Sequence, residues 1–223
     1  MTQAKRIIAI DGPAGVGKST TSRRVAKELN LPHIDTGAMY RAIGLAALRE
    51  EIDPHDEDAL ADLASRTRID FVPGERARVL LNGEDVTDQI RTPEVSMAAS
   101  DVSTVPAVRR ILVRLQQELG RRSGGVLEGR DIGTKVFPGT RCKFFLTARP
   151  EVRAKRRYDE LRTKGVSADF AKVLEETLAR DEQDSTRVDS PLTYDETYTV
   201  IDTSELPIDE VVEAIVKRVR ALC

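Results

Sequence analysis

Along this chain, short runs of apolar residues alternate with longer stretches in which apolar residues recur every three or four positions. The short runs are typical of buried parallel strands and lie at 7–10, 126–128, 143–147 and 198–201, with a very short one at 33–34. The stretches between them have helical spacing. In the last, which Pro207 opens, Val211, Ile215 and Val219 share one face. This alternation predicts an α/β fold of three layers, a central parallel sheet with helices on both faces.

The pattern changes between about residues 65 and 103, where apolar and polar residues alternate. Arg68–Val72 and Ala77–Leu81 flank a Pro73-Gly74 turn, and Asn82-Gly83 marks a second turn. Strands joined by such turns pair antiparallel. Because an antiparallel hairpin does not fit a parallel core, we expect a small β-containing subdomain inserted into the fold.

Composition limits the classes of protein that the chain fits. It has 223 residues, 40% of them apolar, and a net charge of −2. No apolar run approaches the ~18 residues of a membrane span, and Met1–Arg6 leads directly into the first strand without a signal peptide. Cys142 and Cys223 fit no metal-ligand or redox pattern, so we expect both to be bystanders in a reducing compartment. These features predict a cytoplasmic protein that is not bound to a membrane.

The first strand is followed by a glycine-rich loop and then a helix. Gly12, Gly17, Lys18 and Ser19 fit the phosphate-loop pattern G-x-x-x-x-G-K-[ST] in this context. Glycines let backbone N–H groups converge on a polyphosphate, and the N-terminus of the next helix adds its dipole. Lys18 is expected to reach the β- and γ-phosphates, and the Ser19 hydroxyl is the expected ligand of Mg²⁺.

Arginines occur at nearly every segment expected to face the bound nucleotide, namely Arg41, Arg109, Arg130, Arg153, Arg157, Arg180 and Arg187. Two phosphorylated substrates would require such a set, because guanidinium groups bind phosphate oxygens bidentately. A phosphate acceptor with a second pKa of ~6 is largely dianionic at neutral pH and needs no general base. Catalysis then consists of positioning and charge neutralisation. The sequence lacks the N-K-x-D motif of most GTPases, which argues against that class.

Three further blocks carry a resemblance to a known family. They are Asp35–Arg41, Glu128–Thr134 and Arg180–Arg187. Together with the phosphate loop, and in this order and spacing, they resemble bacterial-type cytidylate kinases over essentially the whole chain. The resemblance implies a P-loop fold in three parts: a core at 1–34, 104–148 and 166–223, a nucleoside-monophosphate-binding region with its insert at 35–103, and a lid at 149–165. It implies transfer of the γ-phosphoryl group of ATP to CMP or dCMP, with Mg²⁺.

The resemblance also implies roles for individual residues. The acceptor phosphate would be held by Thr36, Arg41, Arg130 and Arg187, the sugar by Arg180 and Asp184, and cytosine by Ser100, Arg109 and Asp131. Thr36 stands where the family often has serine. Contacts to ATP are expected from Gly12, Pro13, Ala14, Gly15, Val16, Gly17, Lys18, Ser19, Thr20 and the lid residue Arg157. Lys18, Arg130, Arg187 and the lid residue Arg153 are the expected catalytic residues, and Ser19 the expected metal ligand.

Several alternatives stay open at this point. Either Asp11 or Glu128 could orient the water bound to Mg²⁺, or each could form a salt bridge with a core arginine. His33 and His55 are expected to be packing or surface residues without partners. The chain could instead be a kinase of another nucleoside monophosphate or small acceptor. A nucleotide-dependent regulator that binds RNA through the basic helix Arg149–Arg162 is disfavoured by the net charge and by an aromatic content of 4%. We expect a monomer with ATP and CMP or dCMP as partners and no nucleic acid.

Overall fold

The computed structural model describes residues 6–72 and 77–222. The expected Pro73-Gly74 turn, the Cys223 position and most of the expected Met1–Arg6 lead lie outside the described residues. The chain divides into two compact units, which are described one at a time below. One comprises Met1–Ile34 and Gly120–Cys223, and the other comprises Asp35–Leu119.

The first unit contains a five-stranded sheet in the order β2-β6-β1-β7-β8. The strands are β1 (Ile7–Asp11), β2 (His33–Asp35), β6 (Gly125–Gly129), β7 (Cys142–Thr147) and β8 (Thr199–Asp202). β1 pairs parallel with both β6 and β7, and β7 pairs parallel with β8. Asp11, the last residue of β1, lies opposite Gly129 on one side and Phe145 on the other. The loops that follow these strands therefore leave the same edge of the sheet.

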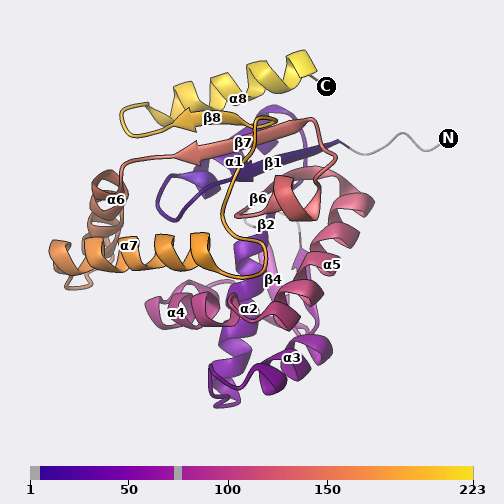
Figure 1. The fold of residues 1–223 in the computed structure, drawn as a ribbon, viewed down its shortest axis with the longest axis vertical. Helices are drawn as coiled ribbons and strands as arrows, with labels where there is room; N and C mark the ends of the chain where they lie inside the picture. Colours follow the sequence, from indigo (N-terminus) through magenta and orange to yellow (C-terminus); the bar gives the residue numbers. More distant parts are fainter. Residues whose placement is uncertain (1–5, 73–76, 223) are drawn as a thin grey trace. The chain divides into compact units, whose positions relative to one another are not determined.

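Helices cover both faces of this sheet, as the strand–helix alternation predicts. On one face, α1 (Lys18–Glu28) and α8 (Ile208–Leu222) bury apolar residues against the strands; Val25, Phe144 and Ile215 belong to this core and are fully buried. Figure 1 shows α8 running beside β8 and β7. On the other face, Gly120 near the end of α5 (Pro106–Ser123) packs against Ile7 and Phe137. The three-layer α/β prediction is confirmed.

Three further elements of this unit carry expected site residues. η2 (Ile132–Val136) is a π-helical turn that follows β6. α6 (Pro150–Thr163) and α7 (Phe170–Thr186) pack against each other as a hairpin (Figure 1). Phe145 of β7 packs against Tyr194, and their ring centroids are 4.5 Å apart.

The second unit combines helices with the expected antiparallel strands. Its three-stranded sheet, in the order β3-β4-β5, consists of β3 (Ile69–Val72), β4 (Arg78–Leu81) and β5 (Glu84–Asp85). Both strand pairs are antiparallel, which confirms the insert. The other elements are α2 (Thr36–Arg49), α3 (Glu57–Arg66), η1 (Gln89–Arg91), α4 (Pro93–Val102) and most of α5.

Sequence reasoning missed α4, although its start carries a recognisable signal. Thr92 caps the helix by accepting a hydrogen bond from the Val95 N–H at 3.2 Å, and Pro93 occupies its first turn. The helix packs closely on α2, because a Cβ on Gly44 would lie 2.8 Å from the Ala99 nitrogen. The helix has only 10 residues and many of them are polar. Sequence reasoning therefore included it in the β-containing insert that precedes it.

Cys142 and the lengths of the helices bear on two further expectations. Cys142 in β7 is fully buried and disulfide-bonded, so the expectation that it is an unpaired bystander was wrong. Among the described helices, none has the length and apolar character needed to cross a membrane.

Candidate active site

The phosphate loop is shaped by close approaches that exclude side chains. Gly12 has φ of +146°, and a Cβ there would lie 2.2 Å from the carbonyl oxygen of Leu146. Gly15 has φ of +80°, and a Cβ there would lie 2.9 Å from Cβ of Arg153. Gly17 is the N-cap of α1 and has no side chain that could accept a hydrogen bond from the first turn. The first N–H groups of the helix therefore have no side-chain acceptor from the cap and can face an anion.

Lys18 begins α1 and lies inside this loop. Its side chain is buried, and Nζ donates to the Pro13 carbonyl oxygen at 2.6 Å. Burial and then the charge of Arg130 hold the pKa of Lys18 well below its usual value, although Glu128, Asp184 and Asp11 oppose this. A polyphosphate at this position would relieve the unfavourable burial of two nearby cations.

Ser19 belongs to a hydrogen-bonded chain that links α1 to two strands. Its hydroxyl donates to Glu128 Oε2 at 2.8 Å, and Glu128 Oε1 lies 2.8 Å from His33 Nε2. Glu128 is almost completely buried. The expectation that His33 has no partner was therefore wrong. The hydroxyl and carboxylate present the oxygen ligands that Mg²⁺ prefers, so the residues fit this ion.

The second carboxylate considered for this role, Asp11, points elsewhere. Its oxygens accept hydrogen bonds from the Ile132 and Gly133 backbone and from the Tyr198 hydroxyl. Among the described residues, these partners are backbone and tyrosine groups instead of the core arginine considered as one alternative. The structure leaves Glu128 as the carboxylate beside Ser19.

Arginines from two segments meet at Asp184, near the C-terminal end of α7. Arg130 Nε donates to Asp184 Oδ2 at 2.7 Å, and Arg187 Nη1 donates to Oδ1 at 3.2 Å. Burial alone would raise the pKa of Asp184, but Arg130, Arg187 and Arg180 together lower it. Burial disfavours the charge on Arg130, yet Asp184 raises its pKa. The structure therefore brings Lys18, Arg130, Arg187 and Arg180 around one carboxylate.

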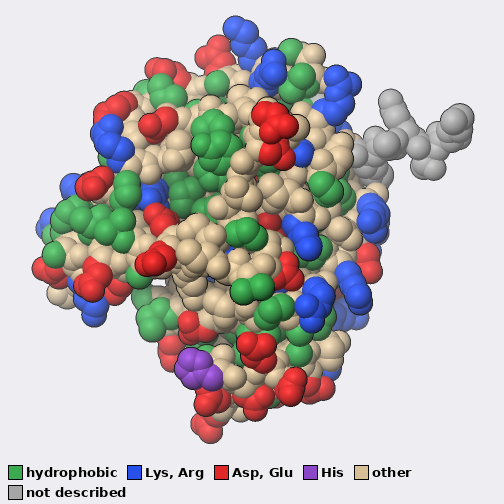
Figure 2. All heavy atoms as spheres, in the orientation of Figure 1, with side chains coloured by type: hydrophobic (Ala, Val, Ile, Leu, Met, Phe, Trp, Pro, Cys, Tyr) green, Lys and Arg blue, Asp and Glu red, His purple; other side chains and the backbone are tan. Residues whose placement is uncertain are grey.

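The two expected lid arginines differ in their surroundings. Arg153 is buried, and all of its guanidinium nitrogens are used: they donate to Ala148 O, Ala14 O and both oxygens of Asp181. Arg157 is partly exposed and donates to Glu160 at 3.0 Å. Figure 2 shows acidic, basic and hydrophobic side chains close together on the α6–α7 hairpin. Arg153 thus braces the phosphate loop, whereas Arg157 lies on a solvated surface.

In the second unit, Asp35 holds the block Asp35–Arg41 together by two hydrogen bonds. Asp35 caps α2, accepting from the Ala38 N–H at 3.1 Å with one oxygen and from Arg41 Nη2 at 2.7 Å with the other. The Arg41 guanidinium lies over Gly37, where a Cβ would be 3.2 Å from Nη1. Nε of Arg41 is buried without a hydrogen-bond partner. The motif therefore fixes one guanidinium with a donor still available for an anion.

The other expected residues of this unit lie on neighbouring helices. Arg109 is almost fully buried, with its guanidinium 5.4 Å from the centre of the Tyr40 ring and Nη1 donating to Ser103 O at 3.2 Å. Thr36 is buried in the first turn of α2. Ser100 lies in α4, the helix that packs on α2. Sequence reasoning gave Ser100 no element, because it missed that helix.

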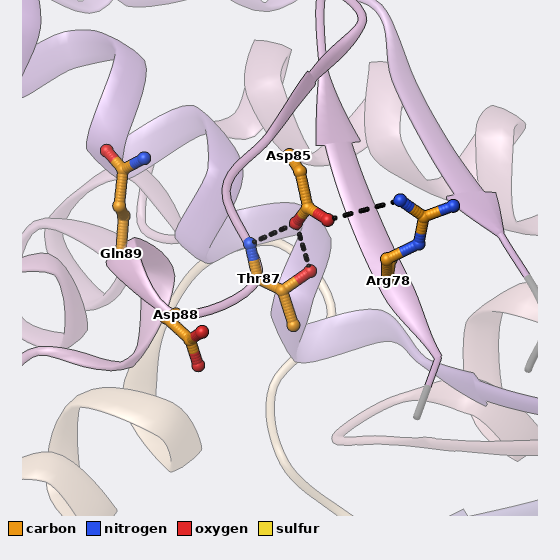
Figure 3. A pocket seen from close by; sticks show the side chains of 5 residues that line it. All are labelled: Arg78, Asp85, Thr87, Asp88 and Gln89. Atoms are coloured by element: carbon orange, nitrogen blue, oxygen red, sulfur yellow. Dashed lines mark hydrogen bonds and ion pairs between the residues drawn. The ribbon is translucent and has the colours of Figure 1, made fainter. Parts of the chain in front are cut away.

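A cavity of about 350 Å³ lies beside the inserted sheet, and other residues of this unit line it (Figure 3). It is lined by Arg78, Asp85, Thr87, Asp88 and Gln89. Asp85 accepts from the Thr87 N–H at 3.0 Å and from its hydroxyl at 2.6 Å, and it pairs with Arg78 at 3.5 Å. Asp85 therefore links the segment after β5 to β4, and its charge is already paired.

Comparisons with known proteins agree with this geometry. A sequence profile described as cytidylate kinase matches residues 8–221. Curated cytidylate kinases from Caldicellulosiruptor bescii and Desulforamulus reducens are each 50% identical, over 94% and 97% of this chain and 93% and 97% of theirs. A solved structure of an uncharacterized protein from Eubacterium ventriosum covers 97% of this chain and 99% of its own, with a TM-score of 0.55 and 15% identity, which supports the fold alone. This chain belongs to the cytidylate kinase family.

Proposed function

We propose that this chain transfers the γ-phosphoryl group of ATP to CMP or dCMP, giving ADP and CDP or dCDP. The observation that carries the proposal is the cluster of Lys18, Arg130 and Arg187 around Asp184, beside a phosphate loop, in a member of the cytidylate kinase family. Such a cluster suits a reaction whose main requirement is to hold two polyanions together and neutralise their charge.

In this proposal the loop residues Gly12, Pro13, Ala14, Gly15, Val16, Gly17, Lys18, Ser19 and Thr20 bind the phosphates of ATP. Lys18 neutralises the β- and γ-phosphates. Arg130 and Arg187 hold the acceptor phosphate and the transferring group. The dianionic acceptor attacks without a general base. The buried donors are held in place before substrate arrives, so little reorganisation is required in the transition state.

Mg²⁺ is the implied metal, and Ser19 with Glu128 nearby would hold it. When bound, the ion neutralises charge on the β- and γ-phosphate oxygens. The hydrogen bond from Ser19 to Glu128 keeps the hydroxyl oxygen oriented in the loop. His33 in turn fixes the carboxylate of Glu128.

For the acceptor, we propose that Thr36 and Arg41 bind the phosphate, Arg180 and Asp184 the sugar, and Ser100, Arg109 and Asp131 the base. Asp131 would accept a hydrogen bond from the cytosine amino group. Uracil offers a carbonyl there, which would leave the carboxylate unpaired and favour CMP over UMP. We also propose that residues 149–165 act as a lid over ATP, with Arg157 able to swing from Glu160 to the phosphates.

A coupled assay of ADP release with Mg²⁺-ATP and a panel of CMP, dCMP, UMP, AMP and GMP tests the proposal. We expect kcat/KM for CMP or dCMP to exceed that for UMP by at least about 10-fold, the discrimination that one unpaired buried group provides. Equal or faster turnover of UMP or AMP would instead identify a kinase of another acceptor. Acceptor-independent hydrolysis alone would point to a different class of protein.

A further inference from the structure

Asp11 is completely buried, yet no step of the proposed reaction uses it. It is the last residue of β1, directly before the phosphate loop. Its Oδ1 accepts from the Ile132 N–H at 2.9 Å, and its Oδ2 accepts from the Gly133 N–H at 2.9 Å and the Tyr198 hydroxyl at 2.9 Å. One carboxylate thus joins three segments that are far apart in the sequence.

The two backbone donors belong to the segment directly after Arg130 and Asp131. There the chain turns sharply: the Asp131 carbonyl accepts from the Lys135 and Val136 N–H groups, and η2 begins at Ile132. The Ile132 and Gly133 N–H groups at the start of this turn would otherwise have no helical acceptor. Asp11 supplies that acceptor, and so determines where the turn starts and how Asp131 is presented.

Tyr198 completes the arrangement from the β8 edge of the sheet. It precedes β8 and is buried, with its ring 6.3 Å from that of Phe145 and 5.6 Å from the Lys143 ammonium. A Cβ on Gly133 would lie 2.5 Å from the Tyr198 hydroxyl. The glycine therefore allows the hydroxyl to reach Asp11 while it packs directly against the turn.

The main chain of Asp11 is held independently of its side chain. It lies in the ladder between β6 and β7, opposite Gly129 and Phe145. Removing a contact to the carboxylate should therefore disturb the turn after Asp131 more than the phosphate loop. We propose that Asp11 and Tyr198 are positioning residues that set the selectivity of the acceptor site, by fixing the turn that directly follows Arg130 and Asp131.

This inference rests on the proposed function, and the substitution Tyr198→Phe tests it with little change of shape. The matched control is Tyr194→Phe, because Tyr194 belongs to the same aromatic cluster but is half exposed. The measurements are kcat/KM for CMP and UMP, KM for ATP and the thermal midpoint. Asp11→Asn is a second, stronger perturbation of the same contact. If this variant does not fold, Tyr198→Phe alone decides the test.

For Tyr198→Phe we expect KM for CMP to rise about 5- to 10-fold, the size of one ordinary hydrogen bond, and the CMP/UMP ratio to fall by a similar factor. KM for ATP should stay within about twofold, and Tyr194→Phe should leave every value unchanged. An unchanged CMP/UMP ratio, with both acceptors losing equally or a lower midpoint alone, would overturn the inference and leave the proposed function intact. A wild-type enzyme that does not prefer CMP would overturn both.

Discussion

Arg153 donates a hydrogen bond from Nη1 to the carbonyl oxygen of Ala14, at 3.2 Å. Its Nη1 and Nη2 also pair with Asp181 at 2.8 and 2.5 Å, so the start of α6 is tied both to the phosphate loop and to α7. A planar guanidinium can make these bonds at once, whereas an ammonium cannot. In this conformation Arg153 supports the phosphate loop.

The comparison of Arg153→Ala with Arg157→Ala separates support from direct contact. Arg153→Ala leaves Asp181 without its partner and the loop without its brace, so we expect a lower thermal midpoint and a KM for ATP raised about 10-fold or more. Arg157→Ala removes only a partly exposed pair with Glu160, so the midpoint should not change. If Arg157 contacts the phosphates during turnover, kcat/KM falls without any loss of stability. A stable Arg153→Ala enzyme with normal KM for ATP would contradict the supporting role.

Lys18 offers a case in which activity and stability should respond in opposite ways. Lys18→Met should reduce kcat by about 1,000-fold or more, because a buried cation aimed at the transferring group is lost. Burial and Arg130 hold the pKa of Lys18 well below its usual value, so the charged side chain costs the folded state free energy below the unfolded pKa. The thermal midpoint of Lys18→Met should therefore be equal to or above that of the wild type.

The control for this experiment is Lys27→Met, on the exposed face of the same helix, which should change neither quantity. Turnover by Lys18→Met at near wild-type rates would remove the phosphate loop from the mechanism.

The sequence predicted the sheet, its helices and the phosphate loop, because each depends on local periodicity or on glycines at fixed spacing. Through the resemblance to cytidylate kinases it also named Arg130 and Arg187 for the acceptor phosphate and Asp184 for the sugar, and these roles remain predictions. It missed the partners of His33 and Asp11, because these contacts join residues 95 and more than 120 positions apart. The sequence indicated these contacts only through the positions of the two residues. Both lie in strands of the central sheet, where buried polar groups need hydrogen-bond partners.

Glu128→Gln tests the link between Ser19 and its carboxylate. An amide in place of Oε2 can present a donor to the Ser19 hydroxyl and carries no charge, so the hydroxyl loses its fixed orientation. We expect the Mg²⁺ concentration for half-maximal activity to rise about 10-fold or more, as for other groups that orient metal ligands. Binding of a fluorescent ATP analogue should weaken only when Mg²⁺ is present. The exposed substitution Glu213→Gln should have no effect, and an unchanged Mg²⁺ requirement in Glu128→Gln would exclude this role.

Asp11 should make stability depend on pH in an unusual direction. Burial raises its pKa from 3.8 to about 6, although the Gly133 and Ile132 N–H groups lower it in part. The folded state therefore holds this proton more tightly than the unfolded state, and its free energy of unfolding falls as pH rises from about 4 to about 6. The difference between the two pKa values corresponds to a loss of about 3 kcal/mol in the free energy of unfolding. This loss is complete above about pH 6, where Asp11 is charged in both states. Other carboxylates titrate in the same range, so the comparison with Asp11→Asn isolates this contribution.

The measurement is urea unfolding of wild type and Asp11→Asn at pH 4, 5, 6 and 7. The free energy of unfolding of the wild type should fall relative to that of Asp11→Asn as the pH rises. The variant loses one acceptor oxygen at every pH, but it never buries a charge. A constant difference across this range would show that Asp11 titrates normally and that burial does not raise its pKa.

Hydrogen exchange can locate the part of the α6–α7 hairpin that closes over ATP. The first turn of α6 is already fixed, because Arg153 binds Ala14, Ala148 and Asp181. Beyond it, the ion pairs of Glu160 with Arg157 and Lys164 lie at the surface and contribute little to stability. We expect amides of residues 157–165 to exchange more slowly when ATP and CMP bind together, with little change at 150–154. Amides of α8 serve as the internal control. Uniform slowing along α6 would indicate general stabilisation, and no slowing at 157–165 would rule out a lid there.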